Sequence, residues 1–520
     1  MKEFLQKFGA AVIGILSGFD RVVFRGTLRN MAFEDGLMLY LSVNKIKFKD
    51  AGGHFQAVSE RVKVAALRVA EEQHRPVKYL ASAQTSKEEE ARRIAAKDGV
   101  TAGLICVLTS VEPCYSVLIR RDREAKHQYI KYAPRKCLHY YFYWMHAEVG
   151  LMHVRLQTWF PFTLQVCLNG REWLARSLDG EKIAYRKSEN CFLELSNGAR
   201  AQQLADAQLA TDWPSFLDGL AQPIISLSPE LFGTFKTRYY WSAHQTEWAT
   251  DVMFKTPQAL AELYPRLLRH GIHTFKSPDV MRFLGQYVSP TGRLHGRSKD
   301  EVISSLKQRP EGVRLKHWVG QNSLKLYDKQ GSVLRAEMTI NRARPFKVYR
   351  PKEGGPEDQL AWRYMRQGVA DVYRRAQVSQ ACNERYLSAL AKTNDDCSLE
   401  ESLDVCQPVR WQDRPFRGLN PFGADKELLS ELGRGEYNLN GLRNRDLQAR
   451  LFKHAPGDDA EKRRRCGQIT RKLRMLRAHG LIKKIPKTHR YQLTDKGRTL
   501  VVALGAAKQA STKKLTLLAA

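Results

Sequence analysis

Cysteine is sparse in this chain, and its spacing excludes the commonest structural uses of the residue. The sequence has nine cysteines among 520 residues, and no two of them form a Cys-x-x-Cys pair. Scattered single cysteines are typical of reduced, buried thiols, whereas disulfide frameworks and zinc sites need paired spacing. We therefore expect a cytoplasmic protein whose cysteines bind no zinc.

Long apolar runs and the familiar ligand-binding motifs are also missing. The run from Ala10 to Gly18 is too short to span a bilayer and lacks a leader cleavage signal, so we interpret it as the first core element. The sequence contains no Walker loop, no Gly-x-Gly-x-x-Gly after a strand, no His-Glu-x-x-His and no Cys2His2 spacing. No motif of this kind indicates a cofactor.

Acidic residues are strongly outnumbered. The chain has 85 Lys and Arg against 54 Asp and Glu, which gives a formal net charge of +31 and a pI near 9.8. Such an excess repels itself unless a polyanion neutralises it. We expect DNA as the partner, with RNA as the alternative, and no membrane partner. The sequence leaves the oligomeric state open.

The hydrophobic periodicity predicts an α+β fold in four parts. We expect a mixed α/β body with antiparallel sheets over residues 1–235, a second α/β domain over 236–350, a helical connector and Pro-rich linker over 351–423, and a winged helix-turn-helix over 424–520. Predicted elements include strands at Gly103–Leu108, Tyr115–Arg120, Thr246–Phe254 and Val333–Ile340, a tight turn at Asn169-Gly170, and a helical region from Asp358 to Leu390.

The last part carries the clearest pattern. The expected order is a helix at Lys426–Leu432, a helix from an Asn444 cap to Phe452, a helix at Asp459–Ala478, strands at Leu481–Pro486 and Arg490–Leu493, and a closing helix at Asp495–Leu504. Helix, helix, helix, strand, wing, strand is the winged-helix order, and the third helix has the size to enter a major groove.

Charge supports a nucleic-acid role for this part. From Asp425 to Ala520 the chain has 23 Lys and Arg against nine Asp and Glu. The predicted contact residues are Arg463, Arg464, Arg465, Arg471, Lys472, Arg474 and Arg477 of the third helix, and Lys487, His489 and Arg490 of the wing. The segment Leu476–Thr494 resembles the recognition helix and wing of MarR-like regulators. The alternative is a solvated basic helix in a protein-binding winged helix.

Several acids lie inside strand-like apolar runs, where an unpaired carboxylate is costly. The candidates are Asp20, Asp251, Asp328 and Glu337. Converging acids can hold Mg²⁺ or Mn²⁺ for phosphodiester cleavage, and we predict Asp251 and Glu337 as the metal ligands. The alternative is that Asp328 and Glu337 form structural salt bridges with Lys325, Lys329 and Arg335.

Two resemblances bear on function. The block Gly320–Lys329, followed by Leu334-Arg-Ala-Glu337, is similar to the strand pair of rolling-circle replication initiators. That similarity implies a strand acid, which Asp251 matches, and a nucleophilic tyrosine, for which Tyr327 is the candidate; the family's His-hydrophobe-His metal motif is missing. The run Phe19–Leu28 resembles an uncharacterised bacterial family with the same C-terminal winged helix, which implies no activity.

Aromatic residues crowd one stretch of the N-terminal body. Lys136–Trp144, Gln157–Phe162 and Leu168–Trp173 contain many rings with basic residues between them. Exposed rings stack on bases, whereas a packed sheet core buries them, and the second interpretation is favoured.

Taken together, these patterns predict a mobile-element-type DNA-binding protein that acts as a metal-dependent nuclease, transposase or replication initiator. The alternative is a non-enzymatic winged-helix regulator or an RNA-binding protein. Clustered acids favour the enzyme, and separately paired acids favour the regulator.

Overall fold

The computed structural model of this protein describes residues 1–82, 84–121, 124, 128–286, 288, 302–309, 312–352, 354–356, 358–392, 399–433, 437, 441–452, 454–486 and 488–511. The chain divides into two compact units, each assembled from segments that lie far apart in sequence. The large unit comprises residues 12–255 and 321–383, and the small unit comprises residues 1–11, 256–320 and 384–520.

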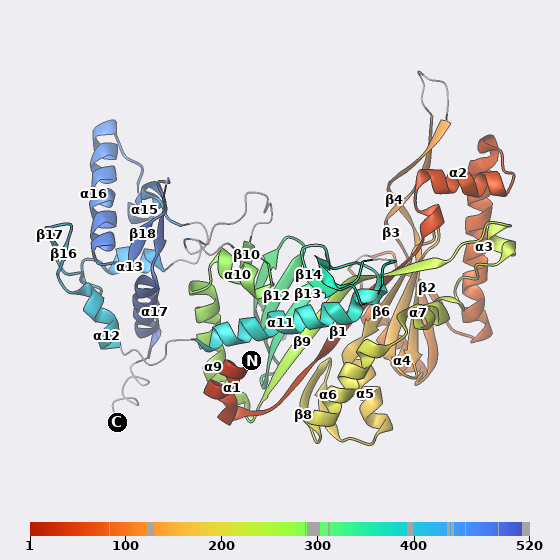
Figure 1. The fold of residues 1–520 in the computed structure, drawn as a ribbon, viewed down its shortest axis with the longest axis horizontal. Coiled ribbons are helices and arrows are strands. Elements are labelled where there is room, and N and C mark those ends of the chain that lie inside the picture. The colour runs from red at the N-terminus through yellow and green to blue at the C-terminus, as the bar shows by residue number, and fades with distance from the viewer. Residues whose placement is uncertain are drawn as a thin grey trace. The chain divides into compact units, whose positions relative to one another are not determined.

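The large unit is built on long strands (Figure 1). Its elements are β1 (Val12–Leu28), α2 (Glu34–Val43), α3 (Ala51–Glu72), β2 (Val77–Tyr79), α4 (Lys87–Asp98), β3 (Gly103–Arg121), β4 (Gln128–His146), β5 (Gly150–Gln157), β6 (Leu164–Asn169), α5 (Gly170–Gly180), β7 (Tyr185–Ser188), β8 (Cys191–Leu195), α6 (Gly198–Ala207), α7 (Trp213–Ala221), α8 (Pro229–Phe232), β9 (Tyr239–Phe254), β12 (Asn322–Lys329), β13 (Val333–Ile340), β14 (Lys347–Arg350), β15 (Ala361–Tyr364) and most of α11 (Val372–Ala391).

The main sheet of this unit runs in the order β12-β13-β9-β1-β6-β5-β4-β3-β2. It is a mixed sheet, because β2 and β3 are parallel while the other described pairs within the unit are antiparallel. The prediction of separate strands before and after Pro113 was wrong. Residues 103–121 form one strand, since β4 pairs with it along its whole length, Pro113 included.

Helices cover both faces of the sheet. On one face α11 donates from Asn383 to the Trp248 carbonyl of β9 and from Arg375 to the Ile340 carbonyl of β13. On the other face α5 and α6 pack against β1, where Leu16, Leu174 and neighbouring apolar residues form a buried cluster. An α+β arrangement of this kind leaves charged residues of the central strands little access to water.

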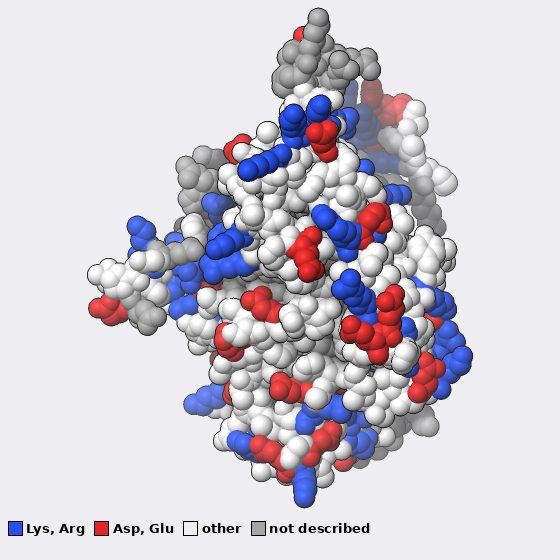
Figure 2. All heavy atoms as spheres, turned by 90° about the vertical axis from the view of Figure 1, so that its right-hand side faces the viewer, with Lys and Arg blue, Asp and Glu red and all other residues white. Residues whose placement is uncertain are grey.

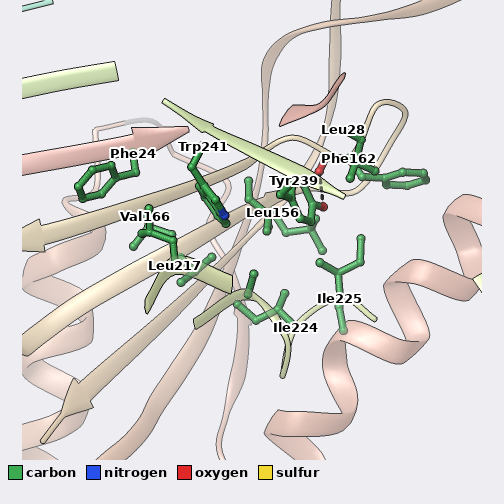
Figure 3. Packing of buried hydrophobic residues seen from close by; sticks show 14 of the residues in the cluster. Phe24, Leu28, Leu156, Phe162, Val166, Leu217, Ile224, Ile225, Tyr239 and Trp241 are labelled. Atoms are coloured by element: carbon green, nitrogen blue, oxygen red, sulfur yellow. Dashed lines mark hydrogen bonds between the residues drawn. The ribbon is translucent and has the colours of Figure 1, made fainter. Parts of the chain in front are cut away.

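The main core of the unit lies at the other end of β1 and β9. Trp241 and Tyr239 of β9 point into the cluster shown in Figure 3, and the Tyr239 hydroxyl donates to the Phe162 carbonyl at 2.9 Å. Because strand residues alternate between faces, Tyr240 between them lies outside this core and is 40% exposed.

One predicted turn and one predicted helix differ in the structure. Asn169-Gly170 is not a hairpin turn: the Asn169 side chain accepts from the Arg171 and Glu172 N–H groups and caps α5. A Cβ at Gly170 would lie 2.2 Å from the Phe19 carbonyl oxygen, so only glycine fits there. The predicted helical region from Asp358 is also wrong at its start, because residues 361–364 form β15 and the helix begins at Val372.

The small unit contains helices, a hairpin and a C-terminal module. Its elements are α1 (Lys2–Phe8), α9 (Pro257–His273), α10 (Ser277–Phe283), β10 (Val302–Arg309), β11 (Gly312–Val319), α12 (Leu399–Leu403), β16 (Val409–Trp411), β17 (Arg414–Phe416), α13 (Lys426–Leu432), α15 (Asn444–Leu451), α16 (Asp459–Ala478), β18 (Ile482–Lys484), β19 (Tyr491–Leu493) and α17 (Asp495–Gln509).

The C-terminal module, α13 to α17, has its own apolar core. Leu428, Leu447, Leu476 and Leu500 are among its fully buried residues. The cap of α15 differs from the prediction: its first residue is Asn444, and Asp446 accepts from the preceding Arg443 N–H at 2.8 Å.

Three simpler expectations can be compared with the described residues. None of their helices is long and apolar enough to cross a membrane. Their cysteines are free thiols, but only four of these eight are buried: Cys114, Cys137 and Cys167 are partly buried and Cys466 is exposed. The face in Figure 2 carries Lys and Arg interspersed with Asp and Glu, so the positive charge forms no continuous surface on that side.

Candidate functional site

Strand alternation gathers acids on one face of β9. Glu247 and Asp251 are four residues apart, so both project from the same side of the strand. Trp248 and Thr250 project from the other side, where both side chains hydrogen-bond to Gln380 of α11. The acidic face is therefore the one that α5 and α6 cover.

The neighbouring strands bring charges of both signs to this face. In the antiparallel register Arg335 of β13 lies across from Asp251, and Lys325 of β12 lies across from Glu337. On the other side of β9, the β1–β9 register shifts between Phe19 and Arg21, so Asp20 occupies a β-bulge. Leu16, Gly18 and Asp20 share this face of β1 by alternation, and the extra residue of the bulge places Arg21 on it as well, across from Glu247.

Three carboxylates from three adjacent strands converge. One oxygen from each of Asp20, Glu247 and Glu337 lies within 4.8 Å of the others, and all three residues are buried. We call these residues the acid triad. Asp20 and Glu337 were predicted candidates, whereas Glu247 was not.

Asp251 is held differently, by two buried arginines. Arg335 donates to its carboxylate from Nε at 2.6 Å and from Nη2 at 2.9 Å, and Arg171 of α5 approaches from Nη2 at 2.9 Å. Arg335 also reaches Asp20 at 3.0 Å and the Asn190 carbonyl at 2.7 Å. These contacts occupy both carboxylate oxygens of Asp251, so the structure brings it close to the triad without making it a member.

Lys325 and Tyr327 of β12 contact the triad itself. The Lys325 ammonium forms a short ion pair with Glu337 and lies 3.5 Å from Glu247. The Tyr327 hydroxyl donates to the other Glu337 oxygen at 2.9 Å. Arg21, half exposed, reaches Glu247 at 3.4 Å.

Burial sets the protonation of the triad. It raises the pKa of Asp20, which the positive charge of Arg335 opposes, and it raises the pKa of Glu247, to which the negative charge of Glu337 adds. Burial pushes the pKa of Glu337 upward as well, but Lys325, Arg335 and the Tyr327 hydroxyl together outweigh it, and the pKa lies below its usual value. Two of the three acids thus hold a proton more tightly than they do in water.

Asp328 lies outside this cluster. It follows Tyr327, so it projects from the opposite face of β12, and one of its carboxylate oxygens is buried without a hydrogen-bond partner. Burial raises its pKa. The predicted pairing of Asp328 with Lys329 or Lys325 is not among the ion pairs of the described residues, whereas the predicted pairing of Glu337 with Lys325 is present.

Glu247, the triad acid missed from the sequence, faces strands that carry a recognisable pattern. Lys325-Leu-Tyr327 and Arg335-Ala-Glu337 alternate a polar residue with an apolar one inside strands that are otherwise buried. Two charged residues spaced by two on one strand indicate a polar stripe on its face. That stripe requires partners of opposite charge on the adjacent strand. Glu247 and Asp251 of β9 both offer one, so the pattern indicates the strand without choosing between its two acids.

The predicted nucleic-acid contacts lie on α16 and beside β19. Arg463, Arg464, Arg471 and Arg474 are exposed, and Arg465, Lys472 and Arg477 are partly buried. Arg465 pairs with Glu461 at 2.6 Å, and the Arg477 guanidinium lies 5.0 Å from the Trp411 ring centre. His489 is exposed and Arg490 partly buried, while Lys487 lies outside the described residues.

The aromatic stretch of the N-terminal body is core. Tyr140, Tyr141, Phe142 and Tyr143 of β4 are each at most 8% exposed. The favoured interpretation, a packed sheet, is therefore confirmed for these rings, and they are not available for stacking on bases.

Comparison of the chain with protein-family models, with curated proteins and with solved structures gave no match.

Proposed function

We propose that this is a nucleic-acid-binding protein of the mobile-element type, which binds duplex DNA through a winged helix formed by α13 to α17. The element order agrees with the predicted helix, helix, helix, strand, wing, strand. Leu442, between α13 and α15, exchanges two 2.8 Å backbone hydrogen bonds with Tyr491 of β19, an isolated bridge that ties this segment to the β18–β19 hairpin. These pairings support the winged helix.

The observation that carries the proposal is the division of α16 into two faces. Ile469, Leu473 and Leu476 are buried in the module core. Arg471 and Arg474 stand exposed between them in sequence, and neither forms an ion pair within the described part of the chain. Exposed guanidinium groups on a helix of this length suit the phosphates and base edges of a major groove.

The test is a change of charge on α16 alone. We expect the triple variant Arg463→Gln, Arg471→Gln, Arg474→Gln to bind duplex DNA far more weakly. The slope of its affinity against salt should fall by about one for each phosphate that the variant no longer neutralises. The matched control makes the same change at three exposed, ion-paired arginines of the large unit: Arg92, Arg93 and Arg186. Equal affinity of the two variants would refute a DNA-binding role for α16.

A second candidate activity, metal-dependent phosphodiester cleavage, is favoured by the acid triad. Carboxylate oxygens are the ligands that Mg²⁺ and Mn²⁺ prefer. The donors are buried and close together, and Lys325, Arg21 and Arg335 balance the three acids when all six groups are ionised. The convergence of carboxylate oxygens, rather than a net negative charge, is what fits a divalent cation, which would be held by Asp20, Glu247 and Glu337.

When bound, such a cation supplies Lewis-acid stabilisation of charge on a phosphate. The chain's own residues define the rest of the site. Arg335 orients Asp20, Lys325 orients Glu337, and the Tyr327 hydroxyl is engaged by Glu337. Burial raises the pKa of Tyr327 well above its usual value, and Glu337 adds to the rise, so this tyrosine keeps its proton and acts as a neutral hydrogen-bond donor to Glu337 rather than as an ionised nucleophile.

The alternative to cleavage is a structural ion network in a non-enzymatic regulator or RNA-binding protein. Titration with Mn²⁺, followed by its paramagnetic resonance signal, separates the two. We expect Glu247→Gln to weaken Mn²⁺ binding about tenfold or more and to remove Mn²⁺-dependent cleavage of labelled DNA, while Glu112→Gln, an ion-paired acid outside the triad, changes neither. A wild-type protein that binds no Mn²⁺ and cleaves neither DNA nor RNA would leave the regulator as the function.

A further inference from the structure

The β14–β15 hairpin of the large unit presents three aromatic rings to solvent. Its register pairs Tyr349 with Trp362 and Lys347 with Tyr364, and residues paired across strands share a face. Tyr349, Trp362 and Tyr364 are 54%, 70% and 55% exposed, while Val348 on the opposite face is buried. The outer face of this hairpin therefore consists of three rings and one lysine.

These rings form a group rather than isolated exposed residues. The Tyr349 and Trp362 ring centres are 5.8 Å apart, and the Lys347 ammonium lies 5.7 Å from the Tyr364 ring centre. Large aromatic residues exposed side by side lose the free energy that burial would supply, and grouped exposure of this kind marks an interaction surface.

Excess positive charge lies under the inner face of the hairpin, where Arg350 shares the buried side of β14 with Val348. Asp371 is fully buried and faces three arginines, with Arg374 at 2.7 Å, Arg366 at 3.3 Å and Arg350 at 3.9 Å. One carboxylate therefore opposes three guanidinium groups, which leaves a local charge of +2. Burial, and next the positive charge of Arg366, lower the pKa of Arg350. An anion placed here would be stabilised.

The chain leads directly from these rings to a hollow. Two residues after Tyr364 comes Arg366, and the segment 366–370 borders a hollow of about 600 Å³ that Arg29, Arg238 and Tyr240 also line. The Arg29 guanidinium lies 4.3 Å from the Tyr240 ring centre. Here again an exposed ring is combined with exposed basic residues.

We propose that the outer face of the β14–β15 hairpin, together with this hollow, binds single-stranded nucleic acid. We call it the ring surface. Bases stack on the rings of Tyr349, Trp362 and Tyr364. The phosphates lie near Lys347 and near the basic residues of the hollow, which are Arg29, Arg238 and Arg366. The occupant is single-stranded because a duplex keeps the faces of its bases hidden, whereas unpaired bases offer a flat apolar surface with one phosphate each. A purely apolar partner would leave the uncompensated arginines unused.

This inference goes beyond duplex binding by α16. The ring surface belongs to the large unit and shares no residue with the acid triad or with residues 424–520. Its test therefore measures binding of single-stranded nucleic acid, whereas the proposed function is tested with duplex DNA. Either proposal can fail while the other holds.

The test uses the full chain and labelled oligo(dT) and oligo(rU), neither of which forms a duplex. We expect Trp362→Ala with Tyr364→Ala to bind oligo(dT) about tenfold or more weaker than the wild type, because each stacking ring contributes substantially to affinity. The matched control is Tyr79→Ala with Tyr115→Ala, two rings exposed to a similar degree on β2 and β3. Duplex affinity should be the same in all three proteins.

Three other outcomes decide against the proposal, and a fourth identifies its ligand. Equal oligo(dT) and oligo(rU) binding by both double variants would place the single-strand contacts elsewhere, and a wild type that binds neither oligonucleotide would refute a single-strand site. Sedimentation that shows wild-type self-association, abolished only in Trp362→Ala with Tyr364→Ala, would assign the ring surface to a second copy. If the variant loses one oligonucleotide and keeps the other, the proposal holds and the ligand is identified as DNA or RNA.

Discussion

The variant Asp251→Asn tests whether Asp251 is a structural acid or a metal ligand in this site. The side chain is fully buried, and it faces Arg335 and Arg171, whose side chains are each only 1% exposed. Asparagine keeps the volume but removes the negative charge, so two buried guanidinium groups lose their common counter-ion. Breaking a buried pair in this way costs about 3–5 kcal/mol, a large part of the stability of an ordinary domain.

That cost can be measured by urea unfolding. With a urea dependence of about 3 kcal/mol per molar, suited to a unit of this size, the midpoint of the large-unit transition should fall by about 1–2 M. Mn²⁺ affinity, measured in the absence of urea, should change far less than in Glu247→Gln, because Asp251 is not a member of the triad.

Asp328→Asn is the matched control, since it makes the same chemical change on β12. One Asp328 oxygen is buried without a hydrogen-bond partner and burial raises its pKa, so neutralising it should leave the midpoint unchanged or raise it. The reasoning is refuted if Asp251→Asn unfolds at the wild-type midpoint while losing Mn²⁺ binding. That result would make Asp251 a ligand and the arginine clamp energetically unimportant.

Three further predictions concern other parts of the molecule. Mn²⁺ affinity should rise with pH above 4.5, because the raised pKa values of Asp20 and Glu247 keep a competing proton on the triad until the pH passes them. Calorimetric titration over a pH series tests this prediction, and an affinity that does not change with pH contradicts it. Gly170→Ala should destabilise the large unit by about 1–3 kcal/mol, since the new Cβ meets the Phe19 carbonyl. Thermal unfolding measures this loss, and Gly180→Ala, where the space around the new Cβ is open, is the control variant. Wild-type duplex affinity should fall roughly 10³-fold between low and moderate salt, and an affinity independent of salt would indicate a protein partner.

Local signals in the sequence predicted individual elements well. Val333–Ile340, Lys426–Leu432 and Asp459–Ala478 have the predicted bounds, because apolar periodicity and end signals such as Gly480 act within a few residues. Asp20 and Glu337 were identified by their burial cost alone. The winged-helix fold, DNA as partner and the domain boundaries at residues 235, 350 and 423 stay predictions.

What the sequence could not supply was pairing between distant segments. The β1–β9 register joins residues more than two hundred positions apart, and the Asp20 bulge exists only within that pairing. Membership of the acid triad depends on both, so Glu247 could not be selected over Asp251 from local pattern. The exposed rings of Trp362 and Tyr364 were missed for a similar reason, since the predicted helix concealed a strand whose partner is β14.

The division of the large unit into two separated segments has a consequence for its synthesis. Asp20 and Arg335, which pair in the finished protein, are 315 residues apart, so the ribosome makes the acid long before the base. Until β13 is complete, the half-formed sheet would bury Asp20 without Arg335 and would leave Asp251 with Arg171 as its only arginine partner, at the cost of poorly compensated charge in an interior without water. The stretch up to Lys255 is therefore expected to stay incompletely folded during translation, with one edge of β9 unpaired. A nascent chain in this state is most prone to aggregate or to need a chaperone.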